Sequence, residues 1–201
     1  MGNGIADRMQ IAKAIQDERH PSMDDMELDI IFDHESIKSL IDAFSSLMNI
    51  GIAIVDKDGN ILVSSGWRDI CTKFHRIHPE TRARCIESDT NLSRNAKPDK
   101  SCLYKCKNGI WDMVTPIMVN GKHLGNLFLG QFLFEDENPD YNWFSLQAKK
   151  YGFDENEYLR ALDKLPRLSE EKLNLVMDFC IKFADVISNQ GYNNIKLVRA
   201  L

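Results

Sequence analysis

Residues 110–134 read IWDMVTPIMVNGKHLGNLFLGQFLF, and this stretch predicts two antiparallel strands joined by a tight turn. Its apolar runs, Ile110 to Val119 and Leu124 to Phe134, are separated by Asn120-Gly121-Lys122, a sequence typical of hairpin turns. Ser101 to Lys105 predicts a short strand just before them. Together these segments predict a three-stranded antiparallel meander.

A second hairpin is predicted earlier in the chain. Ile52 to Val55 and Ile61 to Val63 are short apolar runs on either side of Asp56-Lys-Asp-Gly59-Asn60. Gly59 can adopt a positive φ at no steric cost, as a tight turn between two strands requires. The hairpin and the meander together predict a five-stranded antiparallel sheet.

Helices are predicted before, within and after this run of strands. Asp33 can cap the first helix, and residues 67–96 have a helical pattern in which Pro79 suits a first helical position. Two short helices follow the sheet, near 141–151 and 154–162. The chain is therefore expected to be α+β, with a PAS-like antiparallel five-stranded sheet, a helical insert and flanking N- and C-terminal helices. The first helix has an apolar face at Ile37, Leu40, Ile41, Phe44, Leu47 and Met48.

The final helix is the most regular, and Ser169 can cap it. Its apolar seam suits either packing on the sheet or pairing with a second chain in a homodimer. Residues 189–201 have too few apolar residues to form an element alone, so a connector to a longer protein is expected there. Residues 1–26 are polar and predict a lead-in or linker. The seam residues are Leu173, Val176, Cys180, Phe183 and Ile187.

Composition limits the possible classes of function. The chain has 201 residues, 43% of them hydrophobic and 27% charged, with a formal net charge of −5, which suits one substantial globular domain. No basic excess points to direct nucleic-acid binding, and no apolar run reaches the roughly 18 residues that span a bilayer. Five cysteines without a secretory signal favour a reduced compartment. We expect a cytoplasmic protein without a membrane partner.

Four residues with metal-binding side chains lie between positions 71 and 106. Cys71 and His75 have helical i, i+4 spacing, while Cys85 and Cys106 come from other predicted elements. Three thiolates and an imidazole would satisfy a tetrahedral zinc site, and thiolates would equally hold iron or an iron–sulfur cluster. The cysteines could instead simply fill gaps in the core, or Cys102 and Cys106 could form a redox disulfide. The residues alone leave these alternatives open.

Large apolar side chains near the cysteines predict the walls of a small-molecule pocket. Leu129 and Gln131 alternate onto one face of the last strand, which places an amide in an otherwise apolar row. A buried amide without a partner costs about 1–3 kcal/mol, so the Gln131 side chain must meet backbone, water or a ligand. We expect it to contact a ligand hydroxyl. Asp112 has the opposite parity to Trp111, and its role stays open. The expected ligand-binding residues are Trp67, Phe74, Trp111, Met113, Pro116, Leu129 and Gln131.

The sequence offers little for catalysis. Cys71 and His75 could form a nucleophile and a base, but the chain shows no recognisable orienting third group or oxyanion loop. It also has no glycine-rich phosphate loop and no HExxH sequence. We expect a protein with no catalytic residues, and not an enzyme.

Several ordered motifs, over roughly residues 28–188, resemble the PocR sensory domain. Two features depart from the family pattern: the chain carries no output module, and Cys102 adds a thiol. The domain is thus expected over residues 27–188. The motifs are Phe32-Asp33, the Asp-x-x-Gly hairpin, Cys71-Thr-Lys-Phe-His75, Cys85-Ile-Glu-Ser-Asp89, Tyr104-Lys-Cys106-Lys-Asn-Gly109, Pro116-Ile-Met-Val-Asn-Gly121 and Gly130-Gln131.

The resemblance implies a PAS-like fold in a prokaryotic signalling protein, fused to a DNA-binding, histidine-kinase or cyclic-dinucleotide output module. It also implies sensing of simple hydrocarbon derivatives such as small diols. It favours a metal site at Cys71, Cys85 and Cys106, with His75 as fourth ligand or as a hydrogen-bond donor to one. The alternative hypothesis is a redox- or metal-responsive switch in which the cysteines are the input.

Overall fold

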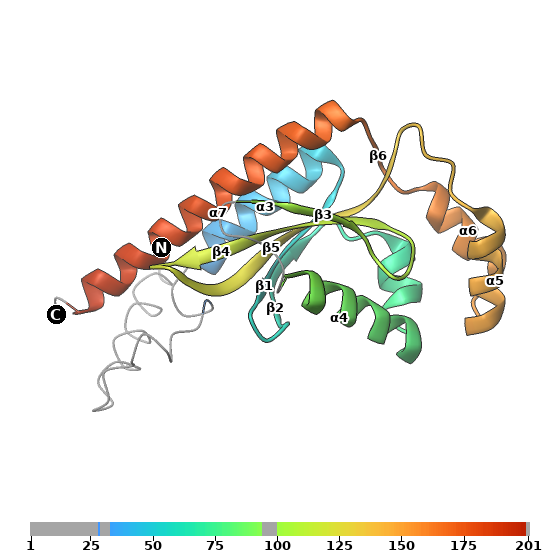
Figure 1. Cartoon of the computed structure of the whole chain (residues 1–201), viewed down its shortest axis with the longest axis horizontal. Helices are drawn as coiled ribbons and strands as arrows, with labels where there is room; N and C mark the ends of the chain where they lie inside the picture. The colour runs from blue at the N-terminus through green and yellow to red at the C-terminus, as the bar shows by residue number, and fades with distance from the viewer. Residues whose placement is uncertain (1–27, 29–32, 94–99, 200–201) are drawn as a thin grey trace.

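The computed structural model describes residues 28, 33–93 and 100–199 (Figure 1). The predicted lead-in over residues 1–26 lies outside these residues. The described helices are α3 (His34–Met48), a short π-helix η1 (Ile70–His75), α4 (Pro79–Ser93), α5 (Tyr141–Tyr151), α6 (Glu155–Asp163) and α7 (Glu170–Arg199). The described strands are β1 (Gly51–Asp56), β2 (Ile61–Ser65), β3 (Cys102–Lys105), β4 (Trp111–Val119), β5 (Lys122–Phe134) and β6 (Arg167–Leu168).

The strands form the predicted antiparallel sheet in the order β2-β1-β5-β4-β3, which is the order of PAS-type domains. The α+β, PAS-like architecture expected from the sequence is therefore confirmed. One strand was not predicted: β6 adds a short parallel pairing to the end of β5. A strand of only two residues is too short to show the alternating pattern by which strands are recognised in a sequence.

Helices cover both faces of this sheet. In Figure 1, α3 and α7 lie side by side on one face, α4 lies against the other, and α5 and α6 pack together at one end. The rings of Phe44 on α3 and Phe179 on α7 stack with centroids 4.3 Å apart. In the described part of the chain, no helix is both long and apolar enough to cross a membrane.

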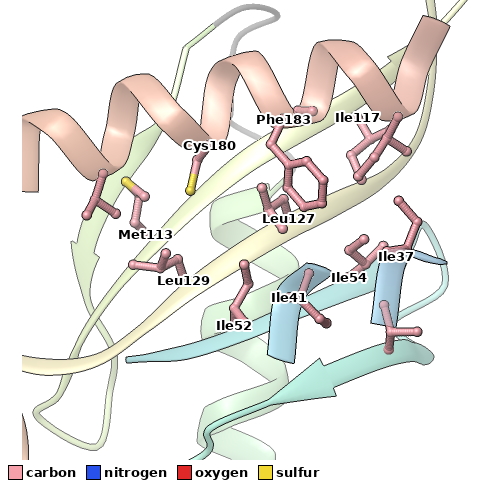
Figure 2. Packing of buried hydrophobic residues seen from close by; sticks show 14 of the residues in the cluster. Ile37, Ile41, Ile52, Ile54, Met113, Ile117, Leu127, Leu129, Cys180 and Phe183 are labelled. Atoms are coloured by element: carbon pink, nitrogen blue, oxygen red, sulfur yellow. The ribbon is translucent and has the colours of Figure 1, made fainter. Parts of the chain in front are cut away.

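The main core lies between the sheet and the α3–α7 layer (Figure 2). Every residue of the predicted α7 seam is buried here, so the seam packs on the sheet and is not available to a second chain. Cys180 belongs to this core, as its place in the seam suggested.

Helix α3 starts and packs largely as the sequence indicates. The Asp33 carboxylate accepts hydrogen bonds from the backbone N–H groups of Glu35 and Ser36, which confirms the predicted cap. The predicted apolar face was too wide, however, because Leu40 and Leu47 are 48% and 81% exposed. Only a narrower i, i+4 stripe of the helix reaches the sheet.

Helix α7 continues to Arg199, whereas residues 189–201 were expected to form no element of their own. Extending an existing helix fixes one residue for each new hydrogen bond, so it avoids the cost of nucleation. The tail residues up to Arg199 therefore join the helix that the packed seam has already formed.

A second, smaller core joins η1 to the α5–α6 pair. Phe74 on η1 packs edge-on against Tyr158 on α6, with ring centroids 5.2 Å apart. The ring centroid of Phe144 on α5 lies 6.0 Å from that of Tyr158. Tyr158 is fully buried at the centre of this cluster. The second core thereby fixes one side of the helical insert.

Candidate functional site

A cavity of about 90 Å³ lies between the sheet and the helical insert. Strands β1 and β5 contribute Ala53 and Phe128 to its wall, while η1 and α4 contribute Cys71 and Cys85 on the opposite side. A dry cavity of about 150 Å³ can hold a benzene ring, so this smaller one suits a ligand of a few heavy atoms. The insert is the element that closes it.

A β-bulge brings Gln131 into the cavity wall. Gly130 pairs with Asp112 and Phe132 pairs with Trp111, so Gln131 is an extra residue on β5, and its φ is 67°. The sequence placed Gln131 on the same face as Leu129, and this was wrong because the bulge interrupts the alternation. The Gln131 side-chain oxygen accepts a hydrogen bond from the backbone N–H of Arg68 at 2.5 Å.

Asp112 also lines the cavity, because it alternates along β4 with Met113, which faces α7 on the other side of the sheet. The sequence did not predict this. One Asp112 carboxylate oxygen, Oδ1, accepts a hydrogen bond from the Gln131 backbone N–H at 3.2 Å. A Cβ on Gly130 would lie only 1.8 Å from that oxygen, so the carboxylate occupies the space that the glycine leaves. Burial, and then the charge of Asp89, raise the pKa of Asp112 well above its usual value.

An ion pair and an aromatic ring form the next part of the wall. Arg76 donates to the Asp89 carboxylate at 2.9 Å, and its guanidinium carbon lies 4.3 Å from the ring centroid of Trp67. The hydroxyl of Tyr104 donates to the other Asp89 oxygen at 3.4 Å. Burial raises the pKa of Asp89, and the charge of Arg76 acts against this shift. Asp89 ends the Cys85-Ile-Glu-Ser-Asp89 motif, but the sequence did not predict its ion pair with Arg76.

Three of the predicted metal ligands, Cys71, Cys85 and Cys106, line this cavity as thiols. Burial raises the pKa of Cys85 to about 11 and raises the pKa values of the other two as well. The sulfur of Cys85 accepts a hydrogen bond from the Asn108 amide, and that of Cys106 accepts one from a backbone N–H. All five cysteines of the chain are described, and all are free. Cys102 does not line the cavity.

His75, the fourth predicted ligand, lines the cavity but is tied into the second core. Its Nε2 lies 2.7 Å from the hydroxyl of Tyr158, which also accepts a hydrogen bond from the Gln147 amide at 2.5 Å. Burial lowers the pKa of His75 to about 3, so the imidazole is neutral. Among the described residues, no three His, Cys, Asp or Glu side chains are placed to hold a metal ion. The four predicted ligands thus surround one cavity without forming a coordination site in this structure.

The predicted ligand-binding residues divide between the cavity and the two cores. Trp67 and Gln131 line the cavity. Met113 and Leu129 face the other side of the sheet, beneath α7, as Figure 2 shows. The sequence could not show which face the insert would cover, because both faces of β4 and β5 are apolar. The remaining predicted residues do not line the cavity: they are Phe74 in the second core, Trp111 beside Phe134, and Pro116, buried in β4.

Comparison with known proteins agrees with the family resemblance that the sequence motifs indicated. The family model described as "Sensory domain found in PocR" matches residues 30–192. The chain belongs to the PocR sensory-domain family. The Regulatory protein PocR of Salmonella typhimurium is 24% identical over 160 residues, a match that covers 74% of this chain and 51% of the relative. The chain therefore spans about half the length of this curated member of the PocR family.

A structural comparison gives a more distant neighbour of this PocR-family domain. The cofactor binding GAF domain of the nutrient sensor CodY from Clostridium difficile superposes with a TM-score of 0.33 and 14% identity. The match covers 75% of this chain and 94% of the GAF domain.

Proposed function

We propose that this PocR sensory domain binds a small organic molecule, such as a short diol, in the cavity between its sheet and its insert. The observation that carries the proposal is the cavity itself, which is about 90 Å³ in volume and has both apolar and polar walls. Ligand sites are typically apolar pockets with a few convergent polar groups that fix orientation. Trp67 and Phe128 supply apolar surface here, and Gln131 and Asp112 supply polar groups.

The signal is proposed to arise from differential binding. A ligand that contacts the insert and the sheet together favours the arrangement in which both close on it, and so shifts the population towards that state. Strands β4 and β5 carry the cavity on one face and α7 on the other, so a change in the sheet reaches α7 directly.

The partner of α7 is proposed to be an output module in a longer cytoplasmic protein. A histidine kinase, a DNA-binding module or a cyclic-dinucleotide module would each suit this role. A homodimer would have to use another face of α7, because its seam is buried against the sheet. Signalling by binding requires no catalysis from the domain.

Truncation of Trp67 to alanine is expected to weaken binding of propane-1,2-diol about tenfold or more, because the ring forms part of the cavity wall. Gln131→Ala should weaken it similarly by removing a polar contact. Isothermal titration calorimetry measures both effects. Trp143→Ala, on the exposed surface of α5, serves as the control and should bind as the wild type does. If Trp67→Ala and Gln131→Ala bind normally, the ligand does not occupy this cavity.

The second candidate function is a redox- or metal-responsive switch, and it is favoured by the three thiols that line one cavity. Zinc, iron or an iron–sulfur cluster would be held by Cys71, Cys85 and Cys106, with His75 released from Tyr158 or left as a supporting donor. The thiols would then be the input, and no organic ligand would be required.

Cys71→Ser separates the two candidates. Under the main proposal we expect this variant to keep diol affinity within about threefold, since one sulfur is a small part of the wall. Elemental analysis and an absorption spectrum of protein purified anaerobically without chelator provide the second readout. Stoichiometric metal in the wild type that is lost in Cys71→Ser, together with no diol binding, would favour the thiol switch instead.

A further inference from the structure

The charged side chains around the cavity do not balance. Asp56 and Lys57 line it from the β1–β2 hairpin, and Arg76, Asp89 and Asp112 line it from the insert and the sheet. Three carboxylates thus face two cations.

Arg76 is already committed to other groups. Its guanidinium pairs with Asp89 at 2.9 Å and lies over the Trp67 ring at 4.3 Å. The hydroxyl of Tyr104 adds a further donor to Asp89. Asp89 is therefore compensated within the protein, and the arginine that compensates it is held in place by the aromatic ring.

Asp112 is not compensated in this way. The described residues give its carboxylate a single hydrogen bond, from the Gln131 backbone N–H, and no ion pair. An ionised carboxylate can accept about four hydrogen bonds, and Asp112 is partly buried without a cation. Burial disfavours its charged form and so raises its pKa, and a cation bound beside it would favour the charged form. Because the carboxylate also fills the space beside Gly130, it cannot easily turn away from the cavity.

Gln131, whose backbone N–H bonds to Asp112, contributes a second polar side chain to the wall. Gln131 is 7% exposed, and its side-chain oxygen accepts the hydrogen bond from the backbone N–H of Arg68. Its amide nitrogen has no hydrogen-bond partner within the described part of the chain, and the residue lines the cavity. The wall therefore offers a carboxylate acceptor and an amide donor on neighbouring groups of one β-bulge.

We propose that this pair recognises a small amino alcohol, with the ligand's ammonium group on Asp112 and its hydroxyl oxygen on the Gln131 amide. An ammonium group has three hydrogen-bond donors and one positive charge. It therefore supplies the further donors and the cation that Asp112 lacks among the described residues. The inference rests on the proposed binding of a small organic molecule in this cavity, and it specifies that this molecule carries a positive charge. It makes Asp112 the residue that selects a cation over a neutral molecule of the same size.

The test compares 1-amino-2-propanol with propane-1,2-diol, which differ in one group and are nearly equal in size. Isothermal titration calorimetry of the full chain at neutral pH is expected to show the amine binding at least about tenfold more tightly than the diol. Asp112→Asn should remove this preference while keeping the fold, because an asparagine oxygen can still accept the Gln131 hydrogen bond. Asp58→Asn removes the same charge at the hairpin tip, outside the cavity, and should keep the preference.

The outcomes separate this inference from the proposed function. Diol binding as tight as amine binding, or a preference that survives in a folded Asp112→Asn variant, overturns the inference and leaves the proposed function standing. If neither probe binds the wild-type chain, both the inference and the proposed small-organic-ligand site are wrong. Circular dichroism establishes that the variants are folded, and the wild-type comparison of the two probes is decisive without them.

Discussion

Replacing Gly130 with alanine is expected to destabilise the domain by about 3 kcal/mol, the upper end of overpacking costs in protein cores, and to abolish ligand binding. The added Cβ would lie 1.8 Å from an Asp112 carboxylate oxygen and 2.8 Å from the Asp112 Cα. Because the second of these contacts is to backbone, rotation of one side chain cannot relieve the clash. Urea denaturation, followed by circular dichroism, measures the loss.

Gly51 provides the matched control because it pairs with Gly130 across β1 and β5. A Cβ on Gly51 would meet the Gln131 side chain and the Gly130 carbonyl oxygen at 3.3 Å, distances that small shifts can accommodate. We expect Gly51→Ala to cost about 1 kcal/mol or less. Equal losses for the two variants would show that the position of Asp112 does not depend on Gly130.

Tyr158→Phe is expected to destabilise the domain by about 2–4 kcal/mol. The lost hydroxyl holds two buried groups, His75 at 2.7 Å and the Gln147 amide at 2.5 Å, and each would be left without this partner. The ring itself stays, so the packing of the second core is preserved. The free energy of unfolding from urea denaturation measures the effect.

Tyr141→Phe is the control for this substitution. The hydroxyl of Tyr141 donates to Asp163 at 2.7 Å, but the pair is exposed, and water can replace it. A change below about 0.5 kcal/mol is therefore expected. If Tyr158→Phe is equally mild, the buried network does not contribute to the position of the insert.

The parts of the fold that depend on local sequence were predictable. The turn at Gly59 has a φ of 92°, as the hairpin signal requires, and the strands on both sides of it pair antiparallel. The apolar spacing of α7 predicted a single buried seam, although only the structure shows that the sheet covers it. Each of these features is determined by residues within a few positions of one another.

The cavity wall could be predicted only in part, because distant elements assemble it. Trp67 and Gln131 were assigned to it, and they do line it, but the face of Gln131 was assigned wrongly. A one-residue bulge leaves no clear mark on an alternating apolar pattern. The link from His75 to Tyr158 spans 83 residues, and no local signal connects the two. The same limitation left the role of Asp112 open.

The most direct test of the central claim is isothermal titration calorimetry of the wild-type chain and of Ala53→Leu with small diols and amino alcohols. Ala53 is 2% exposed and lines the cavity from β1, so a leucine there would fill the space while the surrounding strands remain paired. The account predicts saturable binding of one molecule per chain in the wild type and none in a folded Ala53→Leu variant. Unchanged binding in that variant, or no binding to the wild type, would contradict it.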